Sequence, residues 1–143
     1  MKGTKILTDH WYVPIEVLKV GDMVMSYGVI QDNKFHKVDS PVPQRIVKIR
    51  KTVQKASRSS CPIVIVQNAF GPNKPFENLV VSLNHGIVDH KGELYAASNY
   101  MNGTTIYQDP TIEIITYYHL ELAAHCAIMA NGVLTETWRD SNV

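Results

Sequence analysis

The chain has 143 residues, of which 45% are hydrophobic and 19% charged, a balance typical of one globular domain and not of a disordered chain. The formal net charge of +1 gives no overall attraction toward nucleic acid or a membrane surface. No apolar run is long enough to span a membrane, and the N-terminus lacks the shape of a signal peptide. We therefore expect a single soluble domain, residues 1–143, that is intracellular or particle-associated by default.

Short stretches rich in β-branched and aromatic residues recur along the chain, and turn residues such as Gly, Pro, Asn and Asp separate many of them. Helical periodicity is scarce, so we expect helix only as single turns at Pro14–Leu18 and Ala97–Tyr100. The stretch Leu120–Ala130 is assigned to strands because it begins inside an aromatic, β-branched run and ends at Asn-Gly. The predicted fold class is all-β. In chain order, the expected strands are Lys5–Leu7, Trp11–Val13, Met23–Tyr27, Arg45–Val53, Pro62–Asn68, Leu79–Ser82, Gly86–His90, Leu94–Ala96, Glu113–Leu122 and Cys126–Ala130.

Two segments of the chain share one pattern of apolar residues. Trp11–Val24 can be laid on Glu93–Ile106 at a constant offset, and Gly21 then coincides with Gly103. Each copy has a strand, a short turn and a glycine before the next strand, where a glycine suits a turn with positive φ. We interpret the pattern as a weak two-fold repeat of two β-arms that wrap on each other within one domain.

A run of four residues, Ser82-Leu83-Asn84-His85, places a hydroxyl and an imidazole at the end of an expected strand. Histidine is the side chain whose proton affinity lies nearest neutral pH, so His85 could transfer a proton. A half-buried structural histidine explains the same spacing equally well. The residues alone leave both interpretations open.

A second cluster of histidines lies near the C-terminus. Alternation puts His119 and Glu121 on one face of an expected strand. His125 follows the small pair Ala123-Ala124, where we expect a bend or a bulge. The cluster predicts a group of imidazoles beside the end of the strand.

The cysteines and histidines indicate neither a metal site nor a disulfide framework. Cys126 lies in an apolar run, where a cysteine is typically a small, inert hydrophobe. With Cys61 it is too little for a framework, although a single bridge stays open. The spacings of His85, His119, His125 and Cys126 fit no standard zinc pattern, so we expect no metal and no other cofactor.

The residues from Ser40 to Phe76 include no acidic side chain and hold half of the chain's basic side chains. One interpretation is a solvated strand edge, protected by alternating cations, with a mobile loop after it. The other is a patch for an anionic partner, although no aromatic residue is interleaved as in sites for single-stranded nucleic acid. The residues of this candidate patch are Arg45, Lys48, Arg50, Lys51, Lys55 and Arg58.

Five segments, in order along the chain, match the motifs of one known family. They are Gly3–Thr8 (a G-T-x-I opening), Val13–Val24 (V-x-x-L-x-x-G-D-x-V), Leu79–His85 (a T-x-x-H block with Ser82 at the Thr position), and, in a C-terminal block, Tyr118–Leu122 with His125 and Ala130–Gly132. Together they resemble the Hint domain, the Hedgehog/intein self-processing fold, and particularly its stand-alone bacterial and viral-type branch. The resemblance implies a horseshoe-shaped all-β fold with two arms related by a pseudo-two-fold axis.

The resemblance also implies a chemistry. In this family a Cys or Ser at the first position attacks the preceding carbonyl, and the T-x-x-H histidine protonates the leaving nitrogen as a general acid. His85 would be that acid and Ser82 its helper. His125 would be the histidine of the C-terminal block, and His119 falls where many members carry Asp.

The chain departs from the family pattern at both ends. The family nucleophile lies a few residues before the Gly of G-T, and only Met1 and Lys2 precede Gly3. At the other end Asn131-Gly132 is followed by Val133–Thr137 without the terminal His-Asn pair of splicing members, and Asn142 lies beyond that register. We therefore expect the acid and the scaffold without either attacking group.

Three functions follow from these matches and departures. The one we favour is a degenerate Hint fold without self-cleavage, kept as a structural or protein-interaction module, for example in a virus particle. The second is an autoprocessing domain, self-cleaving or splicing, whose Cys or Ser lies upstream of Met1. The third is a β-domain that binds an anionic ligand through the basic segment. We accordingly lean against enzymatic activity and expect protein partners and no membrane.

Overall fold

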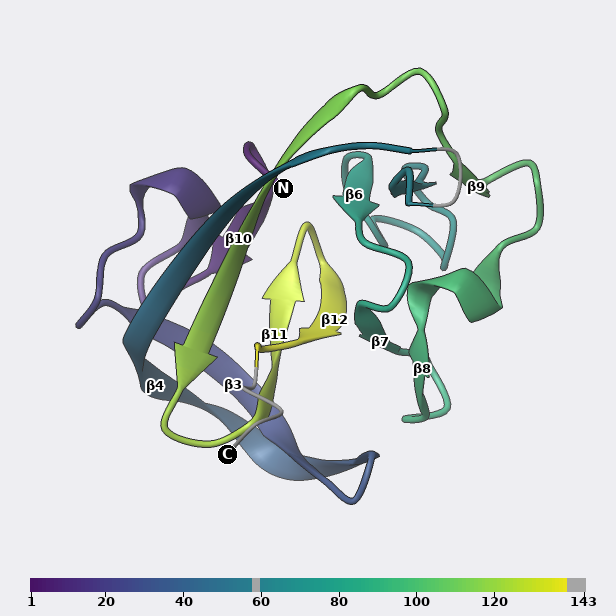
Figure 1. Cartoon of the computed structure of the whole chain (residues 1–143). Coiled ribbons are helices and arrows are strands. Elements are labelled where there is room, and N and C mark those ends of the chain that lie inside the picture. Colours follow the sequence, from purple (N-terminus) through teal and green to yellow (C-terminus); the bar gives the residue numbers. More distant parts are fainter. Residues whose placement is uncertain (58–59, 139–143) are drawn as a thin grey trace.

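The computed structural model describes residues 1–57 and 60–138, and nearly all of their regular structure is strand, as the all-β class predicts (Figure 1). The helical elements of this part are two 3₁₀ turns, η1 (Ile15–Val17) and η2 (Ala97–Tyr100), at the two predicted places. No helix in the described residues has the length and apolar character needed to cross a membrane. The strands are β1 (Lys5–Leu7), β2 (Tyr12–Pro14), β3 (Met23–Gln31), β4 (Lys34–Lys55), β5 (Ile63–Ile65), β6 (Leu79–Val81), β7 (Gly86–Val88), β8 (Leu94–Ala96), β9 (Ile106–Gln108), β10 (Ile114–Leu122), β11 (Cys126–Ala130) and β12 (Val133–Glu136).

The strands form two sheets. The larger sheet has the order β10-β4-β3-β11-β12-β7-β8, and the β1–β2 hairpin joins it because β1 pairs with β11. The smaller sheet has the order β6-β5-β9. Both sheets contribute to one hydrophobic core, whose fully buried members include Ile46, Ile63, Ile65, Leu79 and Ile87. The two sheets therefore share this core.

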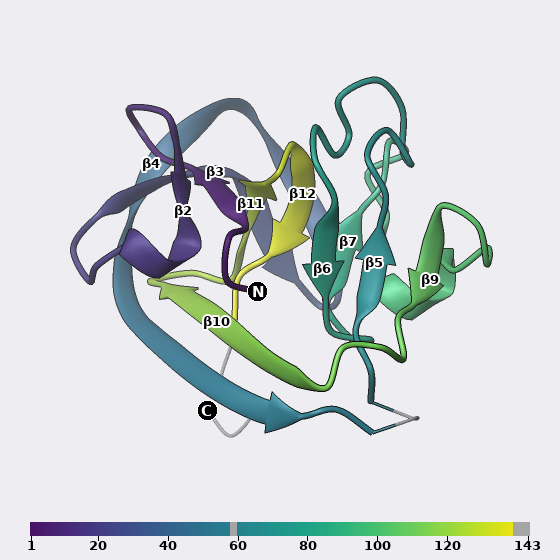
Figure 2. The same cartoon turned by 90° about the horizontal axis from the view of Figure 1, so that it is seen from above.

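The long strand β4 is paired differently in its two halves. Its first half pairs with β3, with Met23 opposite Arg45, and its second half pairs with β10, with Ile46 opposite Leu122. In Figure 2, β4 curves around the outside of the molecule with β10 along its inner side. The predicted strand Arg45–Val53 is thus only part of an element of 22 residues.

Proline is the reason why the first half of β4 was missed. Pro43 reads as a strand breaker because it has no N–H for a sheet ladder. The N–H of Ile46 donates to Asp22 O at 2.9 Å, so alternation turns the nitrogen of Pro43 away from β3. That edge of the first half of β4 carries no paired strand among the described residues, so Pro43 interrupts no ladder there.

Other strand predictions differ from the structure in length or number. Strands β9 and β12 were not predicted, and Pro62–Asn68 and Gly86–His90 are shorter than expected. Strand β12 was missed because Thr135 and Glu136 make it polar, yet it lies in the middle of the large sheet between β11 and β7. Strands on both edges supply its hydrogen-bond partners, and these contacts cannot be read from the segment alone.

The predicted internal repeat is present in the structure. The order β2–η1–β3 recurs as β8–η2–β9, each time with a strand, one 3₁₀ turn and a second strand. Gly21 (φ 99°) and Gly103 (φ 77°) both adopt the left-handed conformation that the pattern required. The fold is therefore the predicted one, with two related arms.

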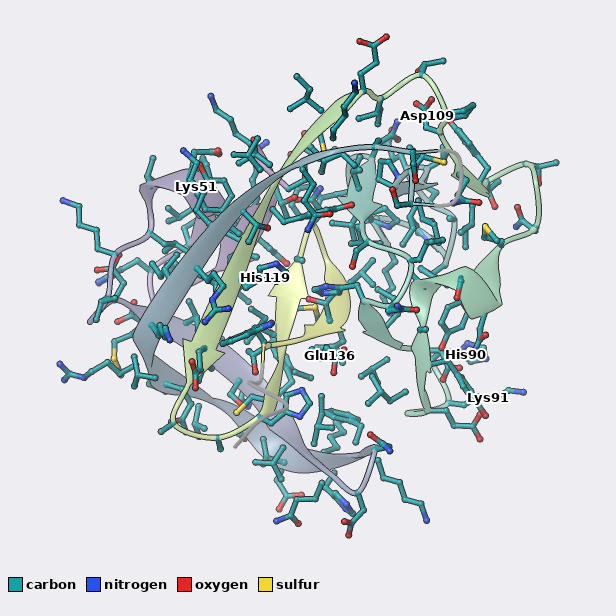
Figure 3. All side chains as sticks on the ribbon, viewed as in Figure 1. Lys51, His90, Lys91, Asp109, His119 and Glu136 are labelled. Atoms are coloured by element: carbon teal, nitrogen blue, oxygen red, sulfur yellow. The ribbon has the colours of Figure 1, made fainter. Side chains whose placement is uncertain are left out.

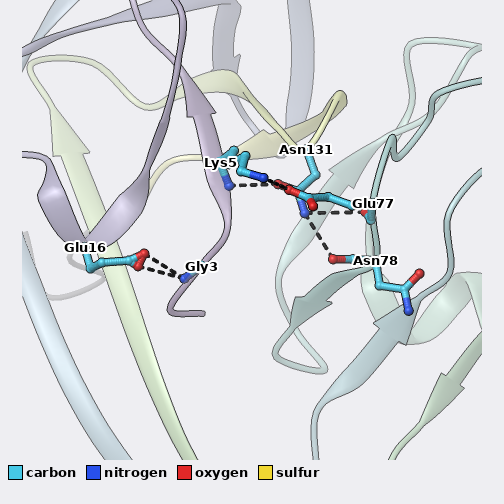
Figure 4. A network of polar contacts seen from close by, with 6 residues as sticks. All are labelled: Gly3, Lys5, Glu16, Glu77, Asn78 and Asn131. Atoms are coloured by element: carbon cyan, nitrogen blue, oxygen red, sulfur yellow. Dashed lines mark hydrogen bonds and ion pairs between the residues drawn. The ribbon is translucent and has the colours of Figure 1, made fainter.

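A buried asparagine fixes the start of the chain to the C-terminal strands (Figure 4). Asn131 Oδ1 accepts the N–H of Lys5 at 2.7 Å, and the N–H of Asn131 donates to Lys5 O at 2.8 Å. Its Nδ2 donates to Asn78 O at 3.1 Å, and Lys5 also forms an ion pair with Glu77. Asn131, which the sequence places in the C-terminal block, is thus a structural tie between β1, the segment before β6 and the β11–β12 turn.

Candidate functional site

The four histidine and serine residues singled out from the sequence line one cavity of about 220 Å³. Ser82 and His85 come from the turn between β6 and β7, His119 from β10, and His125 from the bend between β10 and β11. The bend lies at Ala123-Ala124, as predicted. Segments far apart in the sequence therefore meet at one place, where Figure 3 labels His119 and Glu136.

His85 is a half-buried imidazole at the end of a braced turn. Its N–H donates to Ser82 O at 3.2 Å, and its carbonyl accepts the N–H of Ala97, the first residue of η2, at 2.8 Å. Burial lowers the pKa of His85 to about 4 against an opposing effect of Glu136, and the α-amino group and His119 lower it further. His85 is consequently neutral at pH 7, with one ring N–H to donate and one nitrogen to accept.

Glu136 connects the turn of His85 to His125, and no motif in the sequence pointed to it. One carboxylate oxygen accepts the N–H of Gly86 at 2.9 Å, and the other lies 3.0 Å from His125 Nε2. Burial opposes the ionisation of Glu136, but His125, His85 and the Gly86 N–H together hold its pKa below the ordinary value. The carboxylate therefore stays charged and orients two of the candidate segments.

Gly86 is the residue that makes this close approach of Glu136 feasible. A Cβ atom on Gly86 would lie 2.6 Å from Cδ of Glu136, closer than packed atoms approach. A larger residue after His85 would therefore displace the carboxylate of Glu136 from the Gly86 N–H. The only sequence signal for Glu136 was an acidic side chain in a short strand whose other residues are mostly buried.

His119 lies against Trp138 at the edge of the site. Their ring centroids are 6.2 Å apart, and the Arg50 guanidinium lies 4.4 Å from the centre of the Trp138 ring. Burial lowers the pKa of His119, and the α-amino group and Arg50 lower it further. His119 is therefore neutral at pH 7, and Trp138 lines this end of the cavity.

The N-terminal residue enters the same site from the other side. Met1 lines a second, smaller cavity of about 50 Å³ together with His85, His119 and Trp138. The chain is held there because Lys2 N–H donates to Thr116 O at 3.3 Å and Gly3 N–H donates to Glu16 at 2.8 Å. Burial lowers the pKa of the Met1 α-amino group to about 6, against an opposing effect of Glu16.

Other candidates for chemistry are less well placed. Burial raises the pKa of the Cys126 thiol, which disfavours the nucleophilic thiolate. Cys61 and Cys126 are both buried thiols. Across residues 1–57 and 60–138, no three His, Cys, Asp or Glu side chains are grouped closely enough to hold a metal ion.

The candidate patch for an anionic partner begins at Arg45 and follows the second half of β4. Some of its side chains contact aromatic rings of the protein itself. Lys48 Nζ and the Arg50 guanidinium both lie over the Trp138 ring, at 6.0 and 4.4 Å from its centre. Lys51 Nζ lies 5.8 Å from the centre of the Tyr118 ring. Arg45 and Lys55 are exposed on the same strand, and Arg58 lies outside the described residues.

The chain is similar to known proteins over almost its whole length. A family model described as the Hint domain matches residues 1–142. A comparison with curated protein sequences gave no match.

Solved structures of inteins and an intein-like domain share the fold. One is the solution structure of a bacterial intein-like domain from Clostridium thermocellum, with a TM-score of 0.63, 14% identity, and coverage of 95% of this chain and 96% of that one. Another is the crystal structure of a DnaB intein from Synechocystis sp. PCC 6803, with a TM-score of 0.57, 11% identity, and coverage of 97% and 98%. A third is the crystal structure of the MchDnaB-1 intein, with a TM-score of 0.56, 13% identity, and coverage of 93% and 95%.

Proposed function

Because this chain belongs to the Hint domain family, we propose that it is a Hint domain that keeps the histidines of the site but does not cleave itself. Its role is then that of a structural or protein-interaction module, for example within a larger assembly such as a virus particle. His85, Ser82 and His125 would be the counterparts of the family's acid, its helper and the C-terminal-block histidine.

Support for this role comes from the side chain that lies beside the two imidazoles. Met1 lines the cavity beside His85 and His119. An acyl shift needs a thiol or hydroxyl that can lose its proton and form an ester or thioester, and the thioether of methionine has no such proton. The site therefore contains a neutral imidazole that can polarise an amide, beside a side chain that cannot attack one.

A second candidate is an autoprocessing domain whose nucleophile precedes Met1. One observation favours it. The α-amino group of Met1 lowers the pKa of both His85 and His119, so this nitrogen lies near both imidazoles. A peptide bond from that nitrogen to a preceding residue would begin in the same cavity. A Cys or Ser before Met1 would then lie within reach of the retained acid.

Fusions of a reporter protein to the N-terminus separate these candidates. We expect the fusion with the unmodified chain to stay intact at neutral pH in excess dithiothreitol. We expect a Met1→Cys fusion to release its reporter, because the new thiol attacks the preceding carbonyl and dithiothreitol then cleaves the thioester. Release is followed by gel electrophoresis and by the intact mass of both products.

The control is a Met1→Cys fusion that also carries His85→Ala. Loss of a general acid slows the step by about 100-fold or more, so release from the double variant should be barely detectable. Release from the unmodified fusion would overturn the proposal. Release only when a Cys is inserted before Met1, and not from Met1→Cys, would favour the autoprocessing candidate.

A further inference from the structure

A larger cavity of about 570 Å³ lies apart from the histidine site. Strands β11, β12 and β7 form its floor, and we call it the basic groove. Met129, Leu134 and Val88 line it and are directly opposite one another across the three strands. No described residue lines both this groove and the cavities of the histidine site. The groove and the site are therefore distinct hollows.

The groove has an apolar floor and wall of considerable size. The row Met129–Leu134–Val88 is flanked by Phe35 from the start of β4 and Phe70 from the loop before β6. Its volume falls in the range of roughly 300–1,000 Å³ that is usual for preformed ligand pockets. The groove can therefore take up an apolar side chain.

The loops that form the rim are held in place by their own hydrogen bonds. Two hydrogen bonds close the loop that contains Phe70. The N–H of Phe70 donates to Lys74 O at 2.8 Å, and the N–H of Lys74 donates to Gly71 O at 3.0 Å. The turn between β7 and β8 is closed by Asp89, whose Oδ1 accepts the N–H of Lys91 at 2.9 Å. These hydrogen bonds fix the shape of the rim, which reduces the entropy cost of binding.

Three exposed lysines, one on each wall, surround the floor. Lys37 lies on β4, Lys74 on the loop before β6 and Lys91 on the β7–β8 turn, where Figure 3 labels it beside His90. In the part of the chain that the structure describes, none of the three has a carboxylate within ion-pair distance.

Among the described residues, Asp89 is the one carboxylate that lines the groove, and it accepts hydrogen bonds from other groups of the protein. Asp89 Oδ1 accepts two backbone N–H groups, and its Oδ2 accepts the hydroxyl of Tyr100 at 3.3 Å. Asp89 keeps its charge, but three lysines line the groove against this one carboxylate, so the groove has an excess of positive charge that an acidic partner would neutralise.

We propose that the basic groove binds an acidic segment of a partner protein, with an apolar side chain on the floor and carboxylates at the three lysines. An extended peptide fits this arrangement because the lysines stand on separate walls and call for carboxylates spaced along a chain. The inference rests on the interaction role proposed above and names the surface and the partner chemistry. It also differs from the candidate patch on β4, where Lys48, Arg50 and Lys51 already contact aromatic rings of the protein.

The test uses a fluorescein-labelled peptide of alternating Glu with Leu and Phe, and a second peptide in which Lys replaces every Glu. We expect the acidic peptide to bind in fluorescence anisotropy and the basic peptide not to bind. Reversing Lys37, Lys74 and Lys91 to Glu should weaken binding by at least about tenfold, since three ion pairs are lost and replaced by repulsion. All three side chains are exposed, so the triple variant should fold.

The matched control is the reversal of Lys48, Lys51 and Lys55 on β4 to Glu, which changes the net charge equally and should leave affinity within about twofold. An equal loss of affinity in both triple variants would overturn the proposal that the peptide binds in the groove. Binding of the basic peptide, or no binding of the acidic peptide, would overturn it as well.

Methyl NMR with labelled methionine locates the peptide. We expect the signal of Met129 in the groove to move on titration and that of Met1 in the site to stay. Movement of Met1 alone would place the peptide in the histidine site and overturn the inference. Reporter release tests the proposed function separately, because a protein that cleaves itself can still bind the peptide at Met129.

Discussion

Replacement of Asn131 by Ala is expected to destabilise the protein by about 3–4 kcal/mol. The side chain is 2% exposed, and its amide both accepts from Lys5 N–H and donates to Asn78 O. Alanine would leave those two backbone groups without their partners, and a lost partner in a buried place costs about 1–3 kcal/mol. Alanine would also be strained by the positive φ of 49° at this position. Urea unfolding monitored by tryptophan fluorescence measures the change.

Asn33→Ala is the matched control for this variant. Asn33 has a similar φ of 59°, but it is exposed in the β3–β4 turn, so its replacement changes the backbone strain without a buried network. We expect Asn33→Ala to lower the free energy of unfolding by about 1 kcal/mol. The difference between the losses in the two variants then measures the contribution of the Asn131 hydrogen bonds. Equal costs for the two variants would contradict the role of Asn131 as the tie between β1 and the C-terminal strands.

Acid is expected to destabilise the folded protein well before its carboxylates are protonated. The pKa of His85 is about 4 in the folded state, against 6.5 for the ordinary side chain. Above pH 6.5 both states hold a neutral imidazole, and His85 takes nothing from the stability. As the pH falls from 6.5 to 4, the unfolded chain takes up a proton that the folded site refuses, and up to about 3 kcal/mol of stability is lost.

The other groups of the site act in the same sense. The α-amino group of Met1, whose pKa falls from 8.0 to about 6 on folding, costs stability between pH 8 and 6. The lowered pKa of His119 adds to the loss below pH 6.5, and that of Glu136 adds a further loss below pH 4.5. Stability should therefore decline continuously on acidification, with its steepest part set by the imidazoles.

His85→Asn tests the assignment of this pH dependence to His85. The variant should show a flatter dependence of the free energy of unfolding between pH 6.5 and 4, measured by urea titrations at successive pH values. His10→Asn is the control, because the His10 side chain is 92% exposed. An unchanged slope in His85→Asn, or an equal change in both variants, would show that His85 is not a buried neutral group.

The sequence predicted the scaffold of the site better than its contacts. The T-x-x-H resemblance pointed to His85 and Ser82, and the small pair Ala123-Ala124 pointed to the bend before β11. These features depend on local order along the chain. Glu136 could not be found in this way, because its role comes from contacts with Gly86 and His125 across the sheet, and no spacing in the sequence encodes them.

The same distinction applies to the strands and to the charges. The repeat was visible because its two copies are each local, whereas β12 is a strand only because β11 and β7 lie on its two edges. The basic side chains of β4 were visible as a cluster in the sequence. That Trp138 lies beneath Lys48 and Arg50 was not, because a long separation along the chain hides it.

The position of β11 and β12 has a consequence for the order in which the molecule is made. These two strands come from residues 126–136, yet they lie in the middle of the large sheet, between β3 and β7. They are synthesised after the other described strands. The large sheet therefore cannot form completely until its central strands exist, as in folds dominated by contacts between distant residues. Glu136 is among the last of these residues to appear. The histidine pocket therefore closes only when synthesis has passed β12, and a segment joined ahead of Met1 would have had that whole interval to fold first.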